Sequence, residues 1–154
     1  MASETILIVD DNRQIADFCA RKLLPEMGFA ARVAYTAKQA LEIIESDSLS
    51  LLLLDLHLPD MTGFDLLHKL YECDKKLPTI LITAEGSEQI AADAFRLGVE
   101  DYLPKPIDAG ELALAVNRVL TQHRLREEKD LLTLQLKEQV ALHAVLSRVG
   151  RSIT

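Results

Sequence analysis

Three acidic residues stand directly after short apolar runs, at the places where strands of a parallel sheet would end. Asp10 and Asp11 follow Ile-Leu-Ile-Val, and Asp55 follows four leucines. Because the carboxyl ends of parallel strands meet along one edge of a sheet, these side chains are expected to lie together. Clustered carboxylates repel one another unless a cation joins them, and an all-oxygen site of this kind suits Mg²⁺, which leaves room for a phosphate. The residues therefore indicate a phosphate-handling metal site.

The segments that must position these carboxylates alternate between strand and helix patterns. Helical stripes of apolar residues lie between short apolar runs. The runs predict strands at residues 6–9, 30–35, 51–54, 79–82 and 102–103. This alternation predicts an α/β fold with a parallel sheet and helices on both of its faces.

Local signals mark several helix ends. Pro25 predicts that the first helix ends or bends there. The patterns Thr36 to Gln39 and Asp108 to Glu111 predict capping boxes at the starts of the second and last helices. The expected buried face of the first helix consists of Ile15, Phe18, Cys19, the stem of Lys22, and Leu23.

Composition and charge limit the classes of function. The 154 residues fit one domain plus an extension. No apolar run approaches the roughly 20 residues of a membrane span, and no signal peptide is evident. The two Cys residues lack a CxxC pattern. From these observations we expect a cytoplasmic protein. Residues 1–110 carry 10 Lys and Arg against 19 Asp and Glu, and residues 111–154 carry 7 against 5. This distribution argues against direct binding of nucleic acid by the chain.

Two further polar residues stand at strand ends, Thr83 and Lys105. Together with the three acidic residues, the turn at 59–63, Thr83-Ala84 and Lys105-Pro106, they closely resemble the receiver domain of bacterial response regulators. The resemblance covers residues 5–120. It implies a five-stranded, flavodoxin-like (βα)5 three-layer sandwich, with residues 1–120 as the receiver and residues 121–154 as a helical extension.

The resemblance implies a role for each matching residue. Asp55 would be the phosphoacceptor, a carboxylate that attacks a phosphoryl group and becomes an aspartyl phosphate. Lys105 and Thr83 would contact phosphate oxygens, the first through its charge and the second through its hydroxyl. A sensor histidine kinase would donate the phosphoryl group. The protein would then be a signalling phosphoacceptor that takes part in its own phosphorylation and dephosphorylation, rather than an enzyme.

The resemblance also implies the metal ligands. Asp10, Asp11 and Asp55 would hold Mg²⁺ with their carboxylates, and His57 would offer its backbone carbonyl. Tyr102, three residues before the lysine, matches the family's switch aromatic, which fills space that Thr83 vacates when it moves toward phosphate. That movement would rearrange the face of the fourth and fifth helices and the C-terminal helix.

Plainer interpretations exist for each residue taken alone. Asp55 could be a loop carboxylate, Thr83 a strand-end hydroxyl and Tyr102 a core aromatic. Two other functions also use such a site. An Asp-nucleophile phosphohydrolase typically has a second Asp two residues after the nucleophile, where this chain has His57. A degenerate receiver would serve only as a dimerisation scaffold, which the complete set of site residues opposes.

The C-terminal extension carries an imperfect heptad pattern. Leu125, Leu132 and Leu146 are spaced by multiples of seven, with Gln139 completing the series. The pattern predicts a parallel homodimeric coiled coil near residues 121–149 with a polar residue in its seam. The alternative is an amphipathic helix that packs on its own body or on another domain. The segment also resembles a linker to an output domain that is not in this chain.

Overall fold

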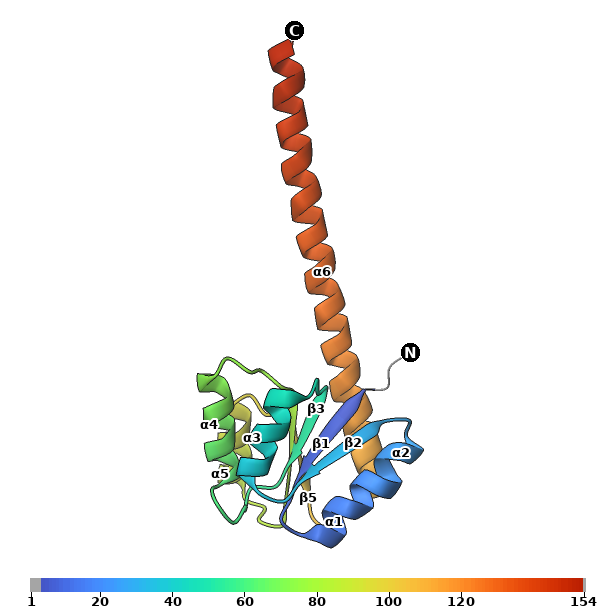
Figure 1. Ribbon diagram of the computed structural model, residues 1–154, viewed down its shortest axis with the longest axis vertical. Helices are drawn as coiled ribbons and strands as arrows, with labels where there is room; N and C mark the ends of the chain where they lie inside the picture. The colour runs from blue at the N-terminus through green and yellow to red at the C-terminus, as the bar shows by residue number, and fades with distance from the viewer. Residues whose placement is uncertain (1–3, 154) are drawn as a thin grey trace. The chain divides into compact units, whose positions relative to one another are not determined.

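A computed structural model describes residues 4–153 of the chain (Figure 1). The chain divides into two compact units, Met1–Leu120 and Thr121–Thr154. The first unit contains β1 (Thr5–Val9), α1 (Arg13–Phe18), a π-helical segment η1 (Cys19–Leu23), α2 (Leu24–Glu26), β2 (Ala30–Ala34), α3 (Ala37–Ser46), β3 (Leu51–Leu54), α4 (Gly63–Glu72), β4 (Thr79–Thr83), α5 (Glu88–Arg96), β5 (Asp101–Pro104) and the start of α6 (Ala109–Ile153).

The five strands form one parallel sheet in the order β2-β1-β3-β4-β5. The order steps outward from β1 in both directions, as in the flavodoxin-like fold, so the prediction of fold class is confirmed. Val9 lies opposite Leu54, and Leu54 lies opposite Leu81. Because these registers align the carboxyl ends of β1, β3 and β4, the residues that follow the strands are brought to one edge.

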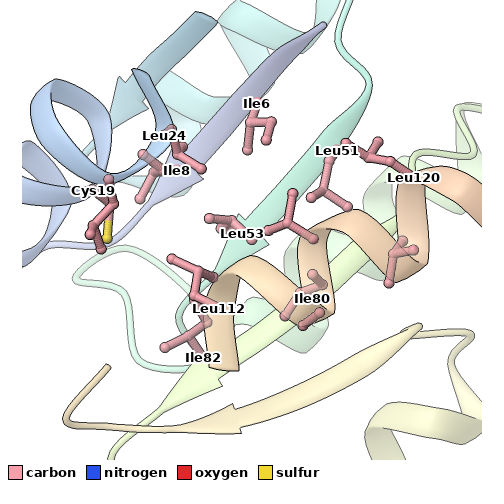
Figure 2. Close-up of a cluster of buried hydrophobic side chains, with 14 of the residues drawn as sticks. Ile6, Ile8, Cys19, Leu24, Leu51, Leu53, Ile80, Ile82, Leu112 and Leu120 are labelled. Carbon is pink, nitrogen blue, oxygen red and sulfur yellow. The ribbon is translucent and has the colours of Figure 1, made fainter. Parts of the chain in front are cut away.

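Helices cover both faces of the sheet, and each face has its own apolar cluster. Side chains alternate between faces along a strand, so consecutive leucines of β3 serve different clusters. Figure 2 shows the cluster beneath α1, α2 and the start of α6, where Leu112 and Leu120 of α6 approach strand residues such as Leu53 and Ile80. The opposite cluster packs α3, α4 and α5 onto the sheet. The central strands are therefore buried on both sides, as their unbroken apolar sequences require.

The first helical segment ends at Glu26, one residue after the proline at which it was predicted to end or bend. Its path differs from a regular α-helix in one place, since η1 is π-helical and widens the turn before Pro25. The amide of Leu24 donates to the carbonyl of Cys19, five residues earlier. Pro25 itself has no amide hydrogen to donate. The expected buried face was partly wrong, since Phe18 is 49% exposed and lies beside the exposed Lys22 ammonium in a cation–π contact.

The second unit consists of the helix from Thr121 onward. In the part of this unit that the structure describes, residues 121–150 are exposed apart from the half-buried His123. The exposed apolar side chains there are Leu125, Leu131, Leu132, Leu134, Leu136, Val140, Leu142, Val145, Leu146 and Val149. Across residues 4–153, no helix is both long enough and apolar enough to cross a membrane.

Candidate functional site

Three carboxylates gather at the carboxyl edge of the sheet. Asp10 directly follows β1 and Asp55 directly follows β3, and both residues are buried, whereas Asp11 is exposed. Each of the three can place a carboxylate oxygen within 4.8 Å of the others. The chain thus presents acidic groups from two neighbouring strands at one point, as the spacing predicts.

A lysine ammonium lies between the two buried carboxylates. Lys105, in the segment after β5, places its Nζ 2.7 Å from Oδ2 of Asp10 and 3.1 Å from Oδ2 of Asp55. The three side chains are only 12%, 6% and 8% exposed, respectively. The backbone also fixes this lysine, because its amide donates to the carbonyl of Thr83 at 3.0 Å. A single cation therefore neutralises part of the charge of two anions.

Burial and ion pairing act differently on the pKa values of Asp10 and Lys105. Burial raises the pKa of the Asp10 carboxyl; the hydrogen bond from Lys105 opposes this rise, and the neighbouring charge of Asp55 reinforces it. Burial also acts to lower the pKa of Lys105, but the hydrogen bonds to Asp10 and Asp55 outweigh it, so that pKa is raised. The two directions agree physically, because the lysine has two anionic partners whereas Asp10 shares one cation and faces another anion.

The connection from β3 to α4 is folded tightly against the phosphoacceptor candidate. The amide of Gly63 donates to the carbonyl of Leu56 at 2.7 Å, and His57 and Thr62 form an isolated antiparallel bridge. A Cβ at position 63 would lie 2.8 Å from the backbone oxygen of Asp55, so the glycine permits this close approach. The amide of His57 points to Oδ1 of Asp55 at 3.4 Å. The loop and the carboxylate therefore hold each other in place.

Asp60, two residues before the end of that connection, contacts a different element. Its two carboxylate oxygens accept hydrogen bonds from the amides of Ala37 at 3.0 Å and Lys38 at 2.9 Å, the first two residues of α3. Desolvation acts to raise the pKa of the Asp60 carboxyl, but these hydrogen bonds, together with those from the backbone of Asp60 and Met61, outweigh it and hold that pKa below its ordinary value. Sequence patterns did not reveal this contact, because its partners are more than 20 positions apart.

The connection from β4 to α5 links the remaining predicted residues. Thr83 is fully buried, and its hydroxyl accepts a hydrogen bond from the amide of Glu85 at 3.2 Å. The carbonyl of Glu85 accepts a hydrogen bond from the Tyr102 hydroxyl at 3.0 Å. The Glu85 carboxylate also pairs with the exposed ring of His57. Glu85 thus joins Thr83, Tyr102 and His57 through three separate groups.

The residues present fit a hard divalent cation. All the side-chain donors are carboxylate oxygens, and three of them lie within reach of one another. The backbone carbonyl of His57 lies in the segment directly after Asp55. Mg²⁺ accepts such oxygens and keeps several waters, so an acidic cluster with two buried members and the exposed Asp11 suits it.

Residues 6–117 match the family model of the response regulator receiver domain. The transcriptional regulatory protein CpxR of Escherichia coli K12 is 37% identical over 124 residues, which are 80% of this chain and 52% of CpxR. The receiver domain of a LuxO repressor protein from Vibrio parahaemolyticus has a TM-score of 0.77 at 30% identity, covering 82% of this chain and 96% of that one.

A CheY-like receiver domain protein from Methanospirillum hungatei gives a TM-score of 0.75 at 29% identity, covering 81% of this chain and 99% of that one. The solved receiver structures are thus matched over nearly their whole length. By contrast, the chain spans about half the length of CpxR and of the response regulator SaeR from Staphylococcus epidermidis, at 52% and 50%.

Proposed function

The chain belongs to the response regulator receiver domain family of two-component systems, and from this membership we propose that it accepts a phosphoryl group on Asp55 from a sensor histidine kinase. The observation that carries the proposal is the ammonium of Lys105, held between Asp10 and Asp55 at 2.7 and 3.1 Å. A phosphoryl group joined to Asp55 would meet a fixed positive charge. Phosphoryl transfer depends mainly on positioning and on neutralising charge, and this arrangement supplies both.

In the proposed reaction, an oxygen of the Asp55 carboxylate attacks the phosphorus of a phosphohistidine. The phosphorus–nitrogen bond breaks, an aspartyl phosphate forms, and the histidine takes up a proton. Attack by water on the same phosphorus later releases inorganic phosphate and restores the carboxylate. Lys105 exchanges a carboxylate partner for a phosphoryl oxygen, and the Thr83 hydroxyl donates to another.

We propose that Asp10, Asp11, Asp55 and the carbonyl of His57 hold Mg²⁺ for this reaction. When bound, the ion supplies positive charge that offsets the acidic cluster and the phosphoryl oxygens. The role of this chain's residues is to converge on one point: Asp10 is fixed by the amide of Asn12, which donates to its Oδ1 at 2.9 Å.

The contacts of Glu85 support a conformational switch. The Thr83 hydroxyl accepts a hydrogen bond from the amide of Glu85, and movement of Thr83 toward a phosphoryl oxygen would break this bond. The carbonyl of Glu85 also accepts a hydrogen bond from the Tyr102 hydroxyl, so displacement of Glu85 would free the tyrosine ring to turn inward. We propose that this rearranges the face of α5, β5 and α6 and passes the signal along α6.

Intact-mass spectrometry tests the phosphorylation directly. With Mg²⁺ and acetyl phosphate, the chain should gain one phosphoryl group, and Asp55→Asn should gain none. Asp74→Asn provides a matched control, because it also neutralises an Asp, and this exposed residue follows α4, away from the acidic cluster. Labelling of Asp55→Asn at the wild-type level would overturn the assignment. The same mass measurement without Mg²⁺ should show no adduct.

We also propose that residues 121–149 form a parallel homodimer. The apolar side chains exposed on this helix are the supporting observation, because an isolated helix gains most of its stability from packing. Gln139 would lie in the seam, where a polar pair fixes register. Light scattering on the whole chain and on residues 1–120 tests this: the whole chain should be dimeric and the shorter one monomeric. A monomeric whole chain at high micromolar concentration would contradict it.

Three further expectations belong to the proposal. They are the assignment of residues 121–154 as a linker to an output domain, the cytoplasmic location and the absence of direct nucleic-acid binding. The CpxR relative is named a transcriptional regulatory protein, but this chain matches only 52% of it. The two alternative functions gain no support. An Asp-nucleophile phosphohydrolase has its acid/base residue at the position that His57 occupies, and a degenerate receiver would lack site residues that are all present in this chain.

A further inference from the structure

Asp60 joins two parts of the fold that are remote in sequence. Its carboxylate bridges the amides of Ala37 and Lys38 at the start of α3, with one oxygen on each amide. The residue itself belongs to the β3–α4 connection, the segment that begins at the phosphoacceptor. The contact therefore fixes the part of this connection around Asp60, called here its outer end, to α3. This helix packs on the sheet through Ala37, Ala40 and Ile44.

The start of α3 has a second, local cap. The hydroxyl of Thr36 accepts a hydrogen bond from the amide of Gln39 at 3.1 Å, and the Gln39 side chain accepts one from the amide of Tyr35 at 2.8 Å. These contacts lie within one short segment. Thr36 and Asp60 therefore both satisfy amides of the same helix end, but only Asp60 links that end to the β3–α4 connection.

His57 lies between the two fixed ends of the connection. The inner end is held by the hydrogen bond from Gly63 to Leu56 and by the close approach of Gly63 to the backbone of Asp55. The outer end is held by Asp60. The backbone of His57, whose amide points to Asp55 and whose carbonyl is a proposed metal ligand, is consequently restrained from both sides.

We propose that Asp60 is a positioning residue for the phosphoacceptor site, which it serves by anchoring the β3–α4 connection to α3. The proposal rests on the function proposed above. Without the anchor, the outer end of the connection loses its two hydrogen bonds and the carbonyl of His57 loses its fixed orientation. Partners that orient metal ligands typically change metal affinity by about 10- to 100-fold when they are removed.

The test compares Asp60→Ala with Thr36→Ala in the full chain. Both variants remove a cap from α3, so both should lower Tm by a few degrees. Only Asp60→Ala should weaken Mg²⁺ binding by about 10-fold, measured by calorimetry without a phosphodonor. Its phosphorylation by acetyl phosphate should be slow at low Mg²⁺ and should approach the wild-type rate at saturating Mg²⁺. Asp60→Asn, whose amide oxygen can still accept one hydrogen bond, should be intermediate.

Amide hydrogen exchange reports the anchor itself. The amides of Ala37 and Lys38 should exchange faster in Asp60→Ala, and that of Gln39 faster in Thr36→Ala. Equal Mg²⁺ affinities for the two alanine variants would overturn the positioning role and leave Asp60 as a helix cap alone. If Mg²⁺ binding follows the expected order but the wild-type chain is never phosphorylated, the proposed function fails and the positioning role stands. A wild-type chain that neither binds Mg²⁺ nor is labelled would overturn both.

Discussion

Removal of the Lys105 ammonium should destabilise the first unit far more than removal of a surface cation. The ammonium lies 2.7 Å from Asp10 and 3.1 Å from Asp55, and the three side chains are 12%, 6% and 8% exposed, respectively. At an effective dielectric constant of about 20, unit charges about 3 Å apart interact by about 5 kcal/mol, and desolvation offsets much of this. Breaking a buried pair by removing one partner typically costs about 3–5 kcal/mol, because the other charge is left unpaired.

We expect about 3 kcal/mol for Lys105→Ala without metal, near the lower end of that range. Burial already raises the pKa of Asp10, so this carboxyl can take up a proton and relieve part of the repulsion. The pKa of Lys105 is raised above its ordinary 10.5, so its stabilising contribution is fully present at pH 7 and is lost only as pH rises through the raised value. For a unit of this size the change corresponds to a Tm lower by roughly 10 °C.

Urea unfolding followed by far-ultraviolet circular dichroism measures the free energy of unfolding. Arg32→Ala is the matched control, because Arg32 also pairs with an Asp but its side chain is 49% exposed, and such pairs contribute less than about 1 kcal/mol. Mg²⁺ should restore more stability to Lys105→Ala than to wild type, since it replaces the missing cation. A loss for Lys105→Ala within about 0.5 kcal/mol of the Arg32→Ala loss would refute this reasoning.

Three further predictions concern the same edge of the sheet. Asp11→Ala should keep its fold, because the residue is exposed and one of three clustered carboxylates is removed, but mass spectrometry should show no phosphorylation in Mg²⁺. Gly63→Ala should lower the unfolding free energy by about 1–3 kcal/mol, because its Cβ would lie 2.8 Å from the Asp55 backbone; Gly150→Ala, with nothing within 4 Å, should not lower it. Asp60→Asn should be less stable than wild type at pH 7, because the folded-state pKa of Asp60 is depressed. The difference should shrink as pH falls through the ordinary carboxyl value of 3.8 and vanish only below the depressed folded-state pKa; pH-dependent urea midpoints measure this.

The sequence predicts the sheet and its acidic edge well because both depend on short-range patterns. Leu51–Leu54 is observed with the predicted bounds, and Asp55 follows it as expected. Parallel strands must end level with one another where their registers align, so the approach of Asp10 to Asp55 follows from the strand assignments alone. The resemblance to a known family added the roles of these residues, which no local pattern contains.

Contacts between distant side chains could not be predicted in this way. The pairing of Asp60 with Ala37 and Lys38 depends on where two loops meet, and neither loop carries a signal for the other. The capping pattern at Thr36 was only half right, because the Gln39 side chain accepts from Tyr35 and not from Thr36. A helical stripe also cannot distinguish a buried Phe18 from one that rests beside a lysine at the surface.

The parallel arrangement also separates the connections into two groups with different freedom to change length. The segments that lead from α3 to β3, from α4 to β4 and from α5 to β5 all lie at the amino edge of the sheet, away from the acidic cluster. Residues 73–76 of the connection from α4 to β4 are exposed, so added chain there displaces no core side chain. Lengthening such a loop costs little entropy, about 0.6 kcal/mol for each doubling. A reporter domain or an affinity tag is therefore best inserted at this edge, where the surroundings of Asp55, the proposed phosphoacceptor, are unchanged.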